Sequence, residues 1–326
     1  MSPRALAVLL AKLALSAVLL AVLIKRIPLA SVGESLRAAK PEWLAAAFGL
    51  MLFSNLLGAY QWSRLLRAVG IQIPLWRVTS YYHVGLFFNN FLPANIGGDL
   101  ARIADASRHG PTRAAALSTV LLDRMIGTLA LATLALVTTL PAIDAFHLRV
   151  TYLALVAFFA LAVTLLWAVF HPALLPTTER VLSRVGLGAL KPHLDDLAGR
   201  LQGFRGQRTL FLQLLSVALV VQVARVGVHV LVARALGIAI ALPYFFLFVP
   251  LLAVIVSLPI SFNGLGVREI AGVGLFGLVG VSEPDAFSLQ ITAYFVAVAV
   301  SLLGGVAFLA RLPGRRAGAG VKEGTS

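Results

Sequence analysis

The chain consists largely of long apolar runs separated by short polar segments. A helix needs about 20 apolar residues to cross the hydrocarbon layer of a bilayer. Runs of this length predict six transmembrane helices, over Leu6–Ile24, Trp43–Trp62, Ala114–Leu140, Val150–Phe170, Leu210–Ala233 and Ala286–Ala310. The pattern predicts an all-α polytopic membrane protein that forms a single membrane domain over residues 1–326.

Two further apolar regions, residues 78–110 and 244–280, are interrupted in the middle by helix-breaking residues. The interruptions are "LPANIGGDLAR" and "LPISFNGLGVRE". Each half of these regions has about 14–16 residues, which is too short to span a bilayer comfortably. We expect two re-entrant helical hairpins whose broken backbone is covered by protein or by a polar cavity. The residues that break them are Pro93, Gly97 and Gly98 in the first hairpin, and Pro259, Gly264 and Gly266 in the second.

The two hairpins belong to an internal repeat. The segment "RAVGIQIP" before the first hairpin resembles "RALGIAIALP" before the second, and Arg102 and Arg268 each follow a hairpin proline by nine residues. The sequence therefore predicts a first repeat over residues 43–140 and a second over residues 210–310. With six spans the copies enter from opposite sides, which is the inverted arrangement used for alternating access. A duplication that serves packing alone is the alternative.

Composition and charge agree with a membrane protein. Hydrophobic residues make up 60% of the chain, charged residues 12%, and the mean hydropathy is +0.93. The net charge of +14 comes mostly from Lys and Arg beside the apolar runs, a pattern typical of cytoplasmic loops. No soluble basic domain or aromatic platform for nucleic acid is evident.

The positive-inside rule gives the orientation. The basic segment of residues 171–208, the residues that flank the second span and the C-terminal tail are predicted to be cytoplasmic, as are both termini. Residues 25–41 would then be external although they contain Lys25, Arg26, Arg37 and Lys40. The 171–208 loop has a pattern of leucines and arginines that favours either a surface-bound amphipathic segment or a solvated linker.

Charged residues occur within the apolar regions, where an ionised side chain costs at least about 2.5–3.5 kcal/mol. Arginines exceed acids in this set, so a phosphate is the expected missing anion, because a guanidinium binds phosphate bidentately. The candidate headgroup ligands are Arg102, Arg268, Arg124 and Arg225, with Asn95 and Asn263 as neutral donors; the candidates for charge pairing or coupling are Asp99, Asp123, Glu269 and His229.

Structural roles are the alternatives for several of these residues. Asp99 and Glu269 could only neutralise the hairpin arginines, and Arg124 could extend to the membrane surface. His229 lies four residues after Arg225, on the same helix face, and such a histidine is more often a buried structural residue than a proton relay. The sequence predicts no metal site, no cofactor and no catalytic triad, and it contains no cysteine.

Three segments, "FLPANIGGDLARI", "VLLDRMIG" and "LPISFNGLGVREIAGVGLFGLVGVS", resemble signatures of the lysylphosphatidylglycerol synthase transmembrane, or flippase-like, family. The resemblance covers nearly the whole chain. It implies a domain of the bacterial cytoplasmic membrane that handles lipids with anionic head groups and carries them between leaflets. The soluble domain that makes aminoacyl lipids in some members has no counterpart before Ser326, so lipid aminoacylation is not implied.

The leading hypothesis is translocation of an anionic-headgroup phospholipid, or another lipid phosphate, by a protein that is not itself an enzyme. A second hypothesis is a membrane-embedded lipid transferase or phosphatase with Asp99, Asp123 or Glu269 as the base. A third is a scaffold that presents lipid to a lipid-synthesis enzyme through the 171–208 loop. The lipid, the direction of transport, the energy source and the oligomeric state are left open.

Overall fold

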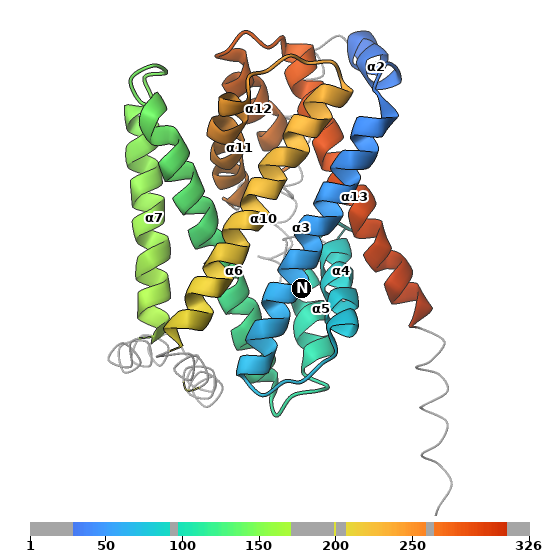
Figure 1. Ribbon diagram of the computed structural model, residues 1–326, viewed down its shortest axis with the longest axis vertical. Coiled ribbons are helices and arrows are strands. Elements are labelled where there is room, and N and C mark those ends of the chain that lie inside the picture. The colour runs from blue at the N-terminus through green and yellow to red at the C-terminus, as the bar shows by residue number, and fades with distance from the viewer. Residues whose placement is uncertain (1–28, 92–96, 171–198, 200–206, 259–263, 312–326) are drawn as a thin grey trace, which may run out of the picture.

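The structure is a computed structural model that describes residues 29–91, 97–170, 199, 207–258 and 264–311. Over these residues it is helical and contains no strand. Five helices are long and apolar enough to cross a membrane. They are α3 (Pro41–Ala68), α6 (Arg113–Thr139), α7 (Arg149–Phe170), α10 (Arg208–Ala235) and α13 (Glu283–Ala310) (Figure 1).

These five helices confirm five of the six predicted spans, and the sixth prediction, Leu6–Ile24, lies outside the described residues. Local sequence signals fix where they begin. Thr112 accepts a hydrogen bond from the Ala115 amide before α6, and Ser282 accepts one from the Asp285 amide before α13. Such N-caps satisfy amide groups that have no partner within the helix.

Both interrupted regions form pairs of short helices. The first pair is α4 (Leu75–Phe91) and α5 (Gly97–Ala106), and the second is α11 (Leu242–Ser257) and α12 (Val267–Gly277). Within each pair the two helices pack against each other. In Figure 1, α4 and α5 lie toward the lower end of the molecule, whereas α11 and α12 lie toward the upper end.

Helices α3 to α6 and helices α10 to α13 have the same order and nearly the same lengths. Helices α3 and α10 each have 28 residues and begin 167 positions apart, and α6 and α13 have 27 and 28 residues. The packing is also reciprocal, because α3 contacts α10, α4 contacts α13 and α11 contacts α6. Each half of the chain thus places its first short helix against the last long helix of the other half, and its second short helix against its own last long helix.

Two helices lie outside this scheme. Helix α7 packs against α6, and the short helix α2 (Leu29–Arg37) packs against α13. Val32 of α2 and Phe287 of α13 are buried in one small apolar cluster. The sequence predicts an external loop over residues 25–41. This segment contains helix α2, which the sequence pattern did not predict. Its apolar residues are too few to produce a membrane-length run.

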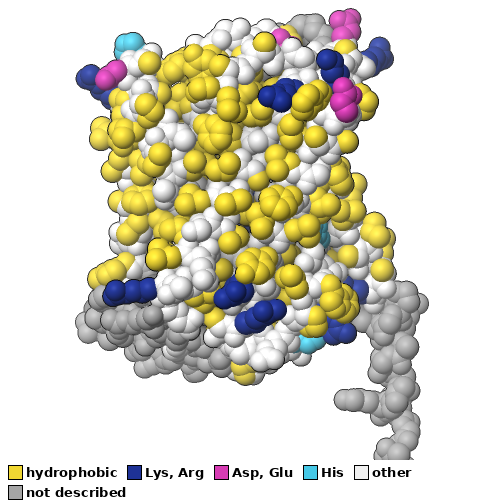
Figure 2. Space-filling model, viewed as in Figure 1, with side chains coloured by type: hydrophobic (Ala, Val, Ile, Leu, Met, Phe, Trp, Pro, Cys, Tyr) yellow, Lys and Arg dark blue, Asp and Glu magenta, His cyan; other side chains and the backbone are white. Residues whose placement is uncertain are grey.

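The surface carries the apolar belt of a membrane protein. Large side chains such as Val150, Leu153 and Val306 are at least 65% exposed in the isolated chain. Figure 2 shows an apolar band around the middle of the visible face, with charged side chains at the two ends. Because such a band is unfavourable in water, it supports a multi-pass membrane protein.

Candidate functional site

The first cluster of charges joins α5 to α6 inside the protein. Nη2 of Arg102 lies 2.7 Å from Oδ2 of Asp123, and both side chains are only 8% exposed. Oδ1 of Asp123 accepts a hydrogen bond of 2.9 Å from the Gln61 amide on α3. Nη1 of Arg102 also lies 3.9 Å from Oδ1 of Asp99, one turn earlier on α5. Asp123 therefore has both oxygens engaged, and it is the closest carboxylate to Arg102.

Two aromatic rings enclose the Arg102 guanidinium. Its central carbon lies 4.3 Å from the centre of the Trp62 ring and 4.8 Å from the centre of the Tyr82 ring. Trp62 is held in place because its indole N–H donates a 3.0 Å hydrogen bond to the hydroxyl of Thr119. A cation over an aromatic face is stabilised by the ring quadrupole, and more so where water is excluded. The rings and Asp123 together compensate the burial of Arg102.

Arg124 completes this cluster from α6. Its Nε donates to Oδ2 of Asp99, and its side chain is 48% exposed whereas that of Asp99 is 14% exposed. Arg102 and Arg124 thus pair with Asp99 and Asp123. Two positive and two negative charges balance, so this cluster by itself presents no surplus charge to an anion.

Glycines allow the close approach that builds the cluster. Gly98, at the start of α5, lies so near the backbone of Gly85 on α4 that a methyl group would overlap the Gly85 carbonyl oxygen. The Gly98 amide also donates a 2.9 Å hydrogen bond to Oδ1 of Asn89. A methyl group on Gly85 would lie 2.8 Å from Cγ of Arg102. The glycines therefore bring α5 onto α4 and direct Arg102 toward α3 and α6.

The second cluster lies where α12 meets α13. The Arg268 guanidinium lies 4.5 Å from the centre of the Tyr294 ring. Glu269 is fully buried and accepts a 2.6 Å hydrogen bond from the Gly266 amide, so it caps the start of α12. Gly264 and Gly266 have φ of +77° and +81°, values that favour glycine. These two glycines therefore serve the turn into α12.

Arg225 occupies an unusual position on α10. Six helix positions three, four and seven residues away share its face. Five of them are buried (Ala218, Val221, Gln222, Val228 and Val232), and the sixth, His229, is half-buried. Arg225 is nevertheless exposed. Among the described residues its side chain forms no hydrogen bond or ion pair, and its carbonyl oxygen lies 3.0 Å from Nδ1 of His229. Arg225 is therefore an exposed charge whose apolar neighbours on this helix face are buried.

Arg225 and His229 each interact electrostatically with a residue of one of the two clusters. Arg225 is close enough to Tyr82 to interact with it electrostatically, as are Arg102 and Asp123, and His229 is within such range of Arg268. The described contacts therefore place Arg102 and Arg268 in separate clusters. The sequence analysis expected the two hairpin arginines to share one anion.

Some of the predicted head-group ligands and hairpin-breaking residues lie outside the described part of the chain, and for the others head-group binding is still a prediction. Pro93, Asn95, Pro259 and Asn263 lie outside the described residues. Headgroup binding by Arg102, Arg124, Arg225 and Arg268 stays a prediction. The neutral partners of the arginines could not be identified from the sequence, because an aromatic or amide side chain within an apolar run carries no charge signal. These partners are Gln61, Trp62, Tyr82 and Tyr294.

Among the described residues, no group of three or more His, Asp or Glu side chains has an arrangement that could hold a metal ion. Residues 9–313 match the family model described as "Lysylphosphatidylglycerol synthase TM region". No curated protein and no solved structure matches the chain.

Proposed function

Because the chain belongs to the family of the lysylphosphatidylglycerol synthase TM region, we propose that it moves a lipid with an anionic head group between the two leaflets of a membrane. The family gives a role that involves membrane lipids. The finer statement, translocation with the head group inside the protein, rests on the arrangement of charges and helices.

The single observation that carries the proposal is Arg225. An arginine in the middle of a membrane helix costs at least about 2.5–3.5 kcal/mol unless a partner or water compensates it. Arg102 and Arg124 bind carboxylates, whereas Arg225 is exposed and has no acidic partner among the described residues. A phosphate bound there would supply the missing negative charge. The second ligand that we propose for the head group is Arg268 of α12. It interacts electrostatically with His229, which is on the same helix as Arg225.

The arrangement of the short helices supports alternating access. The pair α4–α5 lies toward one end of the molecule and the pair α11–α12 toward the other (Figure 1). The two halves also have matching helix lengths and reciprocal packing. We interpret them as an inverted repeat with re-entrant helix pairs, in which each pair closes one side of a central site. Movement of one pair at a time would expose the site to one leaflet.

The distribution of charge supports an orientation. Figure 2 shows dark blue side chains without magenta ones at the lower end, and both colours at the upper end. The basic residues at the helix ends of the lower side are Arg64, Arg67, Arg77, Arg108, Arg113, Arg208 and Arg311, and the acidic residues on the upper side are Glu34, Glu42, Asp144, Glu283 and Asp285. Under the positive-inside rule we assign the lower end to the cytoplasm of a bacterium. Both termini, which are predicted to be cytoplasmic as well, lie outside the described residues.

The contacts of the buried carboxylates favour transport over covalent chemistry. Oδ2 of Asp99 binds Arg124, both oxygens of Asp123 are engaged, and Glu269 caps α12. A general base needs an accessible oxygen within reach of the substrate proton. These carboxylates instead stabilise the structure, so we assign them no catalytic role.

The test is lipid transfer in proteoliposomes that contain a fluorescent phosphatidylglycerol. Replacement of Arg225 by Gln removes a charge-assisted contact worth about 1.5–3 kcal/mol, so transfer should slow by roughly tenfold or more. Arg225→Lys should retain part of the rate because it keeps the charge. Arg234→Gln is the matched control, since Arg234 is on the same helix but stacks on Trp43 near its end. Unchanged transfer by a folded Arg225→Gln protein refutes the proposal.

A further inference from the structure

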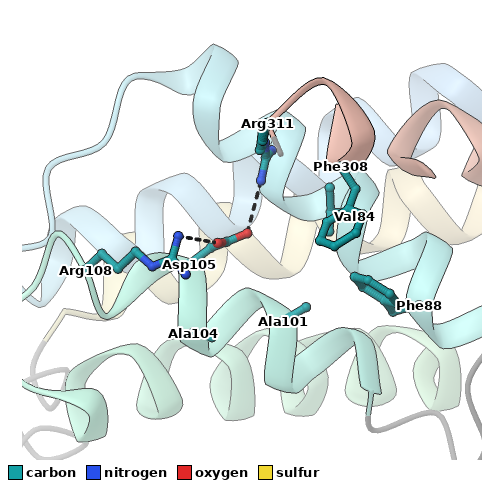
Figure 3. Close-up of a pocket in the computed structure, with 8 residues that line it drawn as sticks. All are labelled: Val84, Phe88, Ala101, Ala104, Asp105, Arg108, Phe308 and Arg311. Atoms are coloured by element: carbon teal, nitrogen blue, oxygen red, sulfur yellow. Dashed lines mark hydrogen bonds and ion pairs between the residues drawn. The ribbon is translucent and has the colours of Figure 1, made fainter. Parts of the chain in front are cut away.

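A pocket separate from the charged clusters opens between α4, α5 and α13, toward the lower end of the molecule. Its volume is about 210 Å³. Val84 and Phe88 of α4, Ala101 and Ala104 of α5 and Phe308 of α13 form its apolar wall, and the rings of Phe88 and Phe308 lie 5.1 Å apart (Figure 3). The depth of the pocket is therefore suited to hydrocarbon.

The rim of the pocket is polar and carries more positive than negative charge. Asp105 lies between two arginines, with its oxygens 3.1 Å from Nη1 of Arg311 and 3.4 Å from Nη1 of Arg108 (Figure 3). Arg311 also donates a hydrogen bond to the hydroxyl of Ser80, and its guanidinium carbon lies 4.5 Å from the centre of the Tyr81 ring. These contacts fix Arg311, whereas the Arg108 side chain is 52% exposed. Arg108 is therefore positioned to bind a further anion at the rim.

Helix α5 separates this pocket from the charged cluster inside the protein. Ala101, Ala104 and Arg108 are three and four residues apart and so share one helix face, which lines the pocket. Asp99 and Arg102 lie on the opposite face and bind partners on α6. The pocket and the Arg225 region are therefore on different sides of the first helix pair.

We propose that this pocket is a second lipid site, which binds an anionic glycerophospholipid of the leaflet on that side. The phosphate binds the exposed Arg108 guanidinium at the rim, beside its pair with Asp105, and part of one acyl chain lies against Phe88 and Phe308. Two arginines and one aspartate at the rim leave one positive charge for a phosphate that carries one negative charge. The apolar wall excludes a free anion from the depth of the pocket. Binding here is independent of transport, because it involves neither Arg225 nor Arg268.

The test uses equilibrium photolabelling of the purified full chain in detergent micelles. A phosphatidylglycerol with a photoreactive acyl chain is added, and labelled peptides are mapped by mass spectrometry. Labels should fall on the α5 and α13 segments that line the pocket. Ala104→Phe fills the space beneath the rim and should reduce this labelling by about tenfold, the loss that follows from a free-energy cost of about 1.4 kcal/mol. Val306→Phe is the matched control, because Val306 on α13 is 65% exposed and lies two residues from Phe308, on another face of that helix.

Charge variants test head-group recognition without altering the apolar wall. Arg108→Gln should weaken labelling by roughly tenfold, as expected for the loss of one charge-assisted hydrogen bond. Arg113→Gln, an exposed arginine at the start of α6, should leave it unchanged. Phosphatidylglycerol should compete better than phosphatidylcholine, and inorganic phosphate should not compete.

Three outcomes would overturn the second site. Labelling that survives Ala104→Phe in a folded protein would show that the chain does not enter the pocket. Equal competition by phosphatidylcholine would show contact with bulk lipid only. Displacement by inorganic phosphate would assign the rim to free anions. Because the readout is binding, each outcome is distinct from a loss of transfer in the Arg225 variants.

Discussion

The buried ion pair of Arg102 and Asp123 makes a quantitative prediction about stability. Replacement of Asp123 by Asn removes the carboxylate that lies 2.7 Å from Arg102 and leaves a guanidinium that is 8% exposed. Breaking a buried pair in this way costs about 3–5 kcal/mol, because the remaining charge has no counter-ion. Asp99 compensates part of that charge from 3.9 Å. We therefore expect a loss near the lower limit, about 3 kcal/mol, which is roughly a hundredfold change in the folding equilibrium.

Thermal unfolding in detergent, followed by the amount of monodisperse protein that remains, measures this loss. Asp144→Asn is the matched control. Asp144 pairs with Arg149 at 3.2 Å, but both side chains are at least 80% exposed. Exposed pairs contribute between zero and about 1 kcal/mol, so the control should unfold close to the parent. The difference between the two aspartates then isolates the effect of burial.

A double variant distinguishes charge pairing from simple packing. Replacement of both Arg102 and Asp123 by Leu removes both charges, so it should be less destabilising than Asp123→Asn alone, as is found when buried pairs are exchanged for apolar residues. If Asp123→Asn unfolds with the parent, or if the double variant is no better than the single one, Asp123 does not neutralise Arg102 and the description of the first cluster is wrong.

Two further substitutions test the packing of the helices. Gly304→Val should lower the unfolding temperature, with a cost of about 1–3 kcal/mol or more, because a side chain there would overlap the His83 carbonyl oxygen, whereas Gly274→Val, beside open space, should have a smaller effect. Trp62→Leu should destabilise by about 3 kcal/mol in the same assay, because it removes a fully buried ring and leaves the Thr119 hydroxyl without its indole donor; an unfolding temperature equal to that of the parent would contradict this account.

The membrane helices could be predicted from the sequence because their lengths follow from a simple physical limit. A run of about 20 apolar residues crosses a bilayer as a helix, and polar residues end it. The predicted span Leu210–Ala233 differs from α10 by only two residues at each end. Helix α2 was not predicted, because a helix of nine residues at the protein surface produces no such run.

The partners of the charges could not be predicted in the same way. The sequence shows an excess of arginine, but it does not show which acid faces which arginine. Arg102 is 21 positions from Asp123 and only three from Asp99, yet the distant carboxylate is the nearer one in space. That choice depends on how closely α5 approaches α4 through Gly85 and Gly98, which is a property of the packed structure.

Comparison of the two halves of the chain suggests why the candidate site has one central cation. Helices α3 and α10 begin 167 positions apart, so the position on α3 that corresponds to Arg225 is Gly58. A methyl group on Gly58 would overlap the Tyr82 ring, so this ring occupies the space that a second arginine would need. Tyr82 in turn lies within electrostatic range of Arg225. Two arginines at such matching positions, on helices that pack together, would repel each other in a medium of low dielectric constant. The fold therefore accommodates one arginine there, and the halves differ in sequence where a symmetric pair would be most costly.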